Sequence, residues 1–91
     1  MARFDCIIGG ATVVTGGDVV RCDIGIRSGR IAALGDDLGI AADTIDARGK
    51  IALPGGIDSH VHISQPSGPG IVMADDFESA TRSAVFGGNT T

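Results

Sequence analysis

Hydrophobic and polar residues alternate along the first half of the chain, and this alternation predicts a series of short β-strands. It is clearest over residues 20–27, where Val, Cys and Ile occupy every second position and Arg, Asp and Gly stand between them. Such a period of two is typical of a half-buried antiparallel strand. Ser28-Gly29 then predicts a two-residue turn, and residues 30–34 predict the partner strand of a β-hairpin.

The flanking segments extend this all-β pattern. Residues 4–14 predict two short strands that Gly9-Gly10 separates by a tight turn or a bulge. Residues 35–42 are acidic and aperiodic, which predicts a loop. Residues 44–47 and 50–53 predict a further hairpin-like pair around Arg48-Gly49.

The character of the chain changes at Pro54-Gly55-Gly56, which interrupts the strand pattern. Residues 57–63 predict a strand whose reverse face is aliphatic, and residues 64–71 predict an irregular loop. A helix follows, with Asp75 as N-cap and Glu78 in a capping box. Its apolar stripe is Phe77, Ala80, Thr81, Ala84 and Val85. Gly87-Gly88 ends the helix, so residues 54–91 predict one β/α unit.

Composition and charge exclude several classes of function. The 91 residues carry a net charge of −4 without any block of Lys or Arg, so the basic surface of a nucleic-acid-binding protein is missing. No apolar run is long enough to cross a bilayer, and Asp5 stands where a signal peptide would need apolar residues. Cys6 and Cys22 lie in alternating runs and are expected to be free thiols, which indicates a cytoplasmic protein.

The candidate chemistry lies in the predicted strand at residues 57–63. In an extended strand Asp58, His60 and His62 point to one face, with the two imidazoles roughly 6–7 Å apart, close enough to bind one ion. An acid two residues before the first His is placed to orient its ring. A His-x-His pair in a half-exposed strand can also be unliganded, but the surrounding glycines and the aliphatic reverse face favour metal binding. The acids at the start of the helix are explained by the helix dipole and need no catalytic role.

These segments resemble a known family. Pro54-Gly55-Gly56-Ile57-Asp58-Ser59-His60-Val61-His62, together with Asp75-Asp76-Phe77 and residues 84–91, is similar to the N-terminal end of cyclic amidohydrolases, and most similar to dihydropyrimidinases and hydantoinases. The resemblance implies an α/β parent fold, a (β/α)₈ TIM barrel joined to a small β-sandwich. Residues 1–53 would supply part of the sandwich, and residues 54–91 the first strand, loop and helix of the barrel.

The resemblance also implies a site and a reaction. His60 and His62 would bind one ion of a two-zinc site, with Asp58 supporting them as a non-ligand. The family's catalytic residues match no position of this chain. The parent would be a zinc-dependent hydrolase that opens the ring amide of dihydropyrimidines or hydantoins with a metal-activated hydroxide. It would act on a small cyclic amide or ureide and assemble as a homo-oligomer, a tetramer in the family.

A complete barrel takes about 250 residues, whereas 35 follow Gly56. We therefore expect an N-terminal fragment that is inactive alone. Three alternatives stay open: a non-catalytic scaffold protein of the same fold, an allantoinase- or dihydroorotase-like hydrolase, and a self-standing small β-protein. Ser64-Gln65-Pro66 stands where dihydroorotases carry Arg-Glu-Pro. This difference argues against a carboxylate-bearing ring, because no guanidinium is present to grip it.

Overall fold

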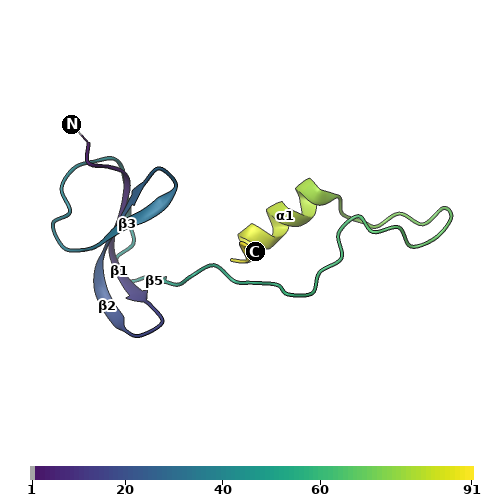
Figure 1. Ribbon diagram of the computed structural model, residues 1–91, viewed down its shortest axis with the longest axis horizontal. Helices are drawn as coiled ribbons and strands as arrows, with labels where there is room; N and C mark the ends of the chain where they lie inside the picture. The colour runs from purple at the N-terminus through teal and green to yellow at the C-terminus, as the bar shows by residue number, and fades with distance from the viewer. Residues whose placement is uncertain (1) are drawn as a thin grey trace. The chain divides into compact units, whose positions relative to one another are not determined.

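The computed structural model describes residues 2–91 (Figure 1). Within these residues the chain divides into two compact units. The first unit ends at Pro54 and contains the strands, and the second spans Gly55–Thr91 and contains the helix.

The first unit is one five-stranded sheet. Its central strand, β1, pairs with β2 on one side in an antiparallel sense and with β4 and β5 on the other side in a parallel sense. The strand β3 completes the order β3-β2-β1-β4, with β5 beside the far end of β1. The strands are β1 Phe4–Val14, β2 Val19–Arg27, β3 Arg30–Gly35, β4 Ala41–Asp46 and β5 Ile51–Ala52.

The hairpin predicted around Ser28-Gly29 is confirmed. Arg27 of β2 pairs with Arg30 of β3, so the turn has two residues. Ser28 and Gly29 have φ angles of 54° and 72°. Two successive positive φ values are those of a type I′ turn, whose twist matches that of the flanking strands.

Residues 4–14 form one bulged strand, so the prediction of two strands is wrong while the predicted bulge is present. The pairing with β2 shifts between Ile8 and Ala11, and Gly10 has a φ of 76°. The bulge turns the Gly10 N–H away from the regular ladder, and the Asp23 carboxylate accepts a hydrogen bond from it at 2.8 Å. A polar side chain thus satisfies the donor and lets β1 continue.

The predicted hairpin of residues 44–47 and 50–53 is also wrong. The turn is present, since the Lys50 N–H donates to the Ala47 carbonyl at 3.0 Å. However, β4 and β5 both run parallel to β1, one after the other along the same edge. The turn interrupts an edge strand without reversing it, and the alternation of residues cannot distinguish these two cases.

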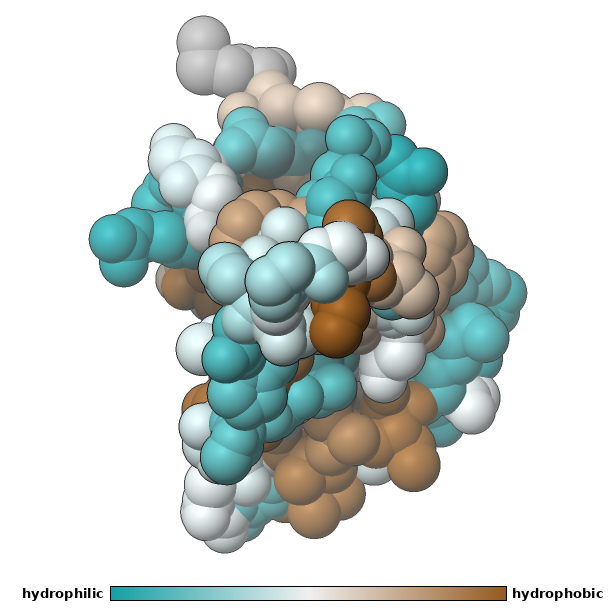
Figure 2. All heavy atoms as spheres, turned by 90° about the vertical axis from the view of Figure 1, so that its right-hand side faces the viewer, coloured by the Kyte–Doolittle hydropathy of each residue, from teal (hydrophilic) through white to brown (hydrophobic). Residues whose placement is uncertain are grey.

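The core of the first unit is small and aliphatic apart from one ring. Its buried residues come from β1, β2 and the turn after β4, and they are Phe4, Ile7, Ala11, Val13, Cys22, Ile24 and Ala47. Other large apolar side chains remain exposed, among them Val20, Ile31, Leu34, Ile45, Ile51 and Leu53. Figure 2 shows brown apolar side chains at the surface of the chain.

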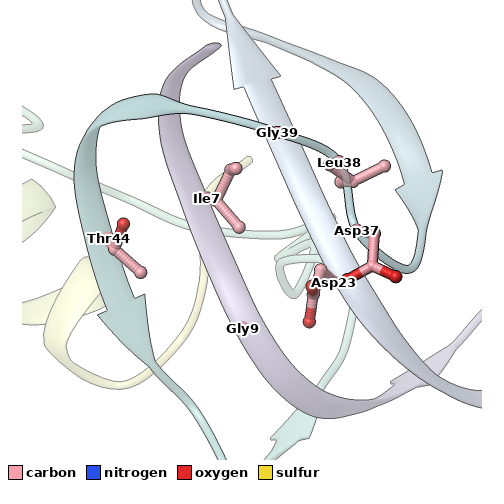
Figure 3. A pocket seen from close by; sticks show the side chains of 7 residues that line it. All are labelled: Ile7, Gly9, Asp23, Asp37, Leu38, Gly39 and Thr44. Carbon is pink, nitrogen blue, oxygen red and sulfur yellow. The ribbon is translucent and has the colours of Figure 1, made fainter. Parts of the chain in front are cut away.

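The surface of the first unit has several shallow hollows, two of which differ in polarity. An apolar groove of about 310 Å³ runs between Val13, Ile24, Leu34 and Leu53. A more polar hollow of about 400 Å³ lies where the loop after β3 crosses β1, β2 and β4. Figure 3 shows Asp23 on β2 and Asp37 on that loop among its lining side chains.

The helix of the second unit, α1, spans Phe77–Phe86 and begins one residue later than predicted. Asp76 is the N-cap, and its carboxylate accepts from the Ser79 N–H at 2.9 Å. The Ser79 hydroxyl in turn accepts from the Asp76 N–H at 3.1 Å. The capping box therefore pairs Asp76 with Ser79, where the sequence predicted Asp75 with Glu78. As predicted, the helix ends at Gly87-Gly88, where Gly88 has a φ of 93°.

The strand predicted at residues 57–63 is not formed as a regular element. Among the described residues its ladder is limited to a parallel bridge between Gly56 and Asn89, extended by the Asp58 N–H donating to the Thr91 carbonyl at 2.8 Å. Beyond this point the Asp58 carboxylate accepts from the His60 N–H at 3.1 Å. This is an Asx-turn, which offers the backbone an alternative to a strand ladder.

Candidate metal centre

The structure brings the two predicted histidines together. The Nε2 atoms of His60 and His62 lie 3.1 Å apart, and their ring centroids are separated by 5.1 Å with the ring planes tilted by 58°. Both side chains are exposed. The two rings therefore approach each other through their Nε2 atoms, even though residues 57–63 do not form a regular strand.

This geometry fits a shared metal ion. Two nitrogen ligands about 2.0–2.1 Å from one tetrahedral zinc ion lie about 3.3 Å from each other. The observed separation of 3.1 Å is close to that value. Imidazole nitrogen is also a preferred donor for zinc. The two side chains could hold one ion with small ring movements, and their role as ligands stays a prediction.

Asp58 contacts the pair differently from the sequence prediction. Its carboxylate binds the backbone N–H of His60, not the imidazole ring. A side chain that fixes the backbone turn between Asp58 and His60 still limits where the first ring can point. Its effect on the ring is therefore indirect, through the main chain.

His60 and His62 have no third candidate ligand beside them in the part of the chain that the structure describes. Among residues 2–91 there is no group of three or more His, Cys, Asp or Glu side chains arranged to hold a metal ion. A catalytic zinc site usually has three protein ligands and a water. His60 and His62 alone would bind an ion weakly.

A pocket of about 380 Å³ lies beside the pair within the second unit. His62, Asp58 and Met73 line it together with Asp75 and residues of α1. The Asp75 carboxylate accepts from the Ser79 hydroxyl at 2.9 Å. Hydrogen bonds from Ser79 lower the pKa of Asp76 below its usual range. Both acids thus serve the start of the helix, as expected from the helix dipole.

One contact near His60 and His62 was not predicted from the sequence. The backbone N–H of Gln65 donates to the Met73 sulfur at 3.0 Å. These residues lie eight positions apart in an irregular loop, so no periodicity indicates that they meet.

Comparison with known proteins finds allantoinases and hydantoinases that match nearly the whole chain, although no family model matches it. An allantoinase from Bacillus licheniformis is 43% identical over 89 residues, which cover 98% of this chain and 20% of that relative. A D-hydantoinase from Geobacillus stearothermophilus is 46% identical over 86 residues, covering 93% and 18% of the two chains. A solved D-hydantoinase structure has a TM-score of 0.89 at 44% identity, covering 96% of this chain and 19% of that one.

The chain thus spans about a fifth of the length of the curated relatives that it matches. In the solved D-hydantoinase the matching part is the N-terminal region. Separately, no helix among the described residues is long and apolar enough to cross a membrane.

Proposed function

We propose that this chain, which is homologous over nearly its whole length to the N-terminal region of hydantoinases and allantoinases, is part of a metal-dependent cyclic amidohydrolase. The reaction would be hydrolysis of a ring amide bond in a cyclic ureide. The observation that carries the proposal is the 3.1 Å approach of the His60 and His62 Nε2 atoms. The same distance also suits a hydrogen bond between one protonated and one unprotonated ring nitrogen, and the zinc content of the protein distinguishes the two roles.

The proposed architecture follows from the same homology. The sheet that ends at Pro54 would form part of a small β-sandwich, with its exposed apolar side chains covered by further strands. Residues 55–91 would form the first β/α unit of a (β/α)₈ barrel. The bridge between Gly56 and Asn89 supports this, because it is parallel, as neighbouring barrel strands are.

In the mechanism, His60 and His62 would hold one of two zinc ions through Nε2. When bound, zinc polarises a carbonyl oxygen and lowers the pKa of water towards neutrality. Asp58 would keep the His60 backbone in its turn and so restrict the first ring. The remaining ligands and the general acid or base would come from outside these residues. The 91 residues alone would therefore be inactive.

Hydantoin-type rings are the proposed substrate class. Relatives named allantoinase and D-hydantoinase match at similar identities, 43% and 46%. Allantoin is itself a substituted hydantoin, so both names describe opening of the same five-membered ureide ring. Dihydropyrimidines carry the same ureide in a six-membered ring. The uncharged Ser64 and Gln65 after the histidines suit a ring without a carboxylate.

Assembly and location belong to the same proposal. A homo-oligomer, such as a tetramer, would cover some of the exposed apolar surface. Cys6 and Cys22 are both free thiols, and Cys22 is buried. Unpaired cysteines are typical of reducing compartments, which supports a cytoplasmic enzyme.

The test is to purify the longer protein that contains this sequence, measure its zinc content and assay ring opening of hydantoin, allantoin and dihydrouracil. We expect about two zinc ions per subunit and hydrolysis of at least one ring. His60→Ala and His62→Ala should each lower zinc content and abolish most of the activity. A folded, metal-free protein that opens none of the rings would contradict the proposal and favour a scaffold of the same fold.

A further inference from the structure

The loop that leaves the histidine pair is closed by a methionine sulfur. The Gln65 N–H donates to Met73 Sδ at 3.0 Å, which joins the beginning of the loop to its end. Inside the loop, the Ser67 hydroxyl donates to the Gln65 carbonyl at 3.3 Å, and the Ile71 N–H donates to the Gly68 carbonyl at 3.2 Å. Figure 1 shows this green segment doubling back before α1.

The backbone of the loop is bent at its start. Ser64, directly before Gln65, has a φ of 53°, a left-handed value that is uncommon for a residue with a side chain. Such a conformation persists where neighbouring contacts hold it. The hydrogen bond from Gln65 to Met73 is the contact nearest to Ser64 that ties this part of the loop to another segment.

Met73 also lies close to the proposed metal centre. Its side chain is half-buried, while most of the loop is exposed. It lines the same pocket as His62 and Asp58. Gln65 follows His62 by three residues, so the position of the Gln65 backbone sets how the loop leaves the metal centre.

We infer that Met73 is a positioning residue, whose sulfur holds the first turn of the loop 64–73 beside the ion bound by His60 and His62. This inference rests on the proposed function for its effect on substrate. A thioether is a weak acceptor, so the expected effect is a modest one on substrate binding. The alternative is a purely structural role, in which Met73 only fills apolar space, as methionine often does.

Three variants of the full-length protein separate the two roles. Met73→Leu keeps apolar volume and removes the acceptor. Met73→Gln offers a carbonyl oxygen on a side chain of similar length. Val72→Leu changes the adjacent residue, which is 90% exposed, and serves as the matched control. Amide hydrogen exchange of the loop reports the Gln65 hydrogen bond directly, without reference to activity.

We expect Met73→Leu to speed exchange in the loop at least threefold and to raise KM for the ring substrate several-fold, with zinc content unchanged and kcat altered less than KM. Met73→Gln should restore slow exchange and most of the KM, and Val72→Leu should resemble the wild type. Unchanged exchange in Met73→Leu would overturn the inference, as would faster exchange with an unchanged KM. If the wild-type protein binds no zinc and opens no ring, the proposed function fails, and the exchange data alone decide whether Met73 holds the loop.

Discussion

Asp58 Oδ1 accepts a hydrogen bond from the backbone N–H of His60 at 3.1 Å. The same residue donates its own N–H to the Thr91 carbonyl at 2.8 Å. Asp58 therefore joins the short parallel pairing of the second unit to the turn that carries the first histidine. A change at this residue should therefore alter the proposed metal centre, although the Asp58 carboxylate contacts neither imidazole ring.

We predict that Asp58→Ala in the full-length protein weakens zinc binding by about tenfold, the lower end of the loss seen when a group bonded to the ligand ring itself is removed, because Asp58 acts only through the His60 backbone. Asp58→Asn keeps an Oδ1 acceptor and should lose only a few-fold. Zinc affinity is measured by competition with a chromophoric chelator. Equal losses in the two variants would show that the charge of Asp58 matters and not its hydrogen bond.

A second prediction concerns the bulge of β1. Gly10 has a φ of 76°, and a Cβ built on it would overlap the aliphatic part of the Arg48 side chain. Gly10→Ala should therefore lower the free energy of unfolding by about 1–3 kcal/mol. Thermal and denaturant unfolding of the full-length protein measures this change.

Gly17→Ala is the matched control for Gly10→Ala. Gly17 lies in the turn before β2, has no positive φ, and a Cβ there would meet open space. Its substitution should change the free energy of unfolding by less than about 0.5 kcal/mol. Equal effects of the two substitutions would contradict the account of the bulge.

These elements also show what a sequence can and cannot predict. The β2–β3 hairpin was predictable because its signals are local: alternation on both sides of a two-residue turn that favours positive φ. The convergence of His60 and His62 was predictable for a similar reason, since only Val61 lies between them. The α1 helix was predicted from its stripe, but its N-cap was misplaced, because Asp75 and Asp76 are adjacent carboxylates and the Ser79 hydroxyl selects the second.

The errors concern partners that lie elsewhere in the chain. The turn at Arg48-Gly49 looks like a hairpin turn, yet β4 and β5 pair with β1, which begins about 40 residues earlier. Residues 57–63 have a strand pattern, but the Asx-turn of Asp58 competes with the ladder where few partners are available. Alternation fixes which side chains share a face and leaves open which strand lies alongside.

A third prediction concerns the ion pair of Asp46 and Arg48, in which Asp46 Oδ2 lies 2.7 Å from Arg48 Nη2. Hydrogen bonds from the Arg48 side chain and backbone lower the pKa of Asp46 from 3.8 to about 2. A carboxyl whose pKa is lower in the folded state contributes stability above its unfolded pKa and loses it as pH falls through the folded value. This contribution should therefore be present at pH 5 and disappear between about pH 4 and pH 2.

Asp46→Asn should flatten the fall of the melting temperature over that pH window. The difference between the variant and the wild type should shrink in high salt, because the pair is exposed and salt screens it. Melting curves at half-unit pH steps measure the effect. Parallel wild-type and variant curves from pH 5 to pH 2 would contradict this role for Asp46.

The last prediction compares the two adjacent acids before α1. Asp76 accepts from the Ser79 N–H at 2.9 Å, whereas Asp75 accepts only from the Ser79 hydroxyl. A carboxylate at the N-cap satisfies a backbone donor that the helix cannot satisfy itself. Asp76→Ala should therefore lower the melting temperature more than Asp75→Ala, and Asp76→Ser should recover most of the loss. Because these hydrogen bonds lower the pKa of Asp76, the penalty of Asp76→Ala should be largest near neutral pH and diminish in acid. A larger penalty for Asp75→Ala would instead place the N-cap one residue earlier.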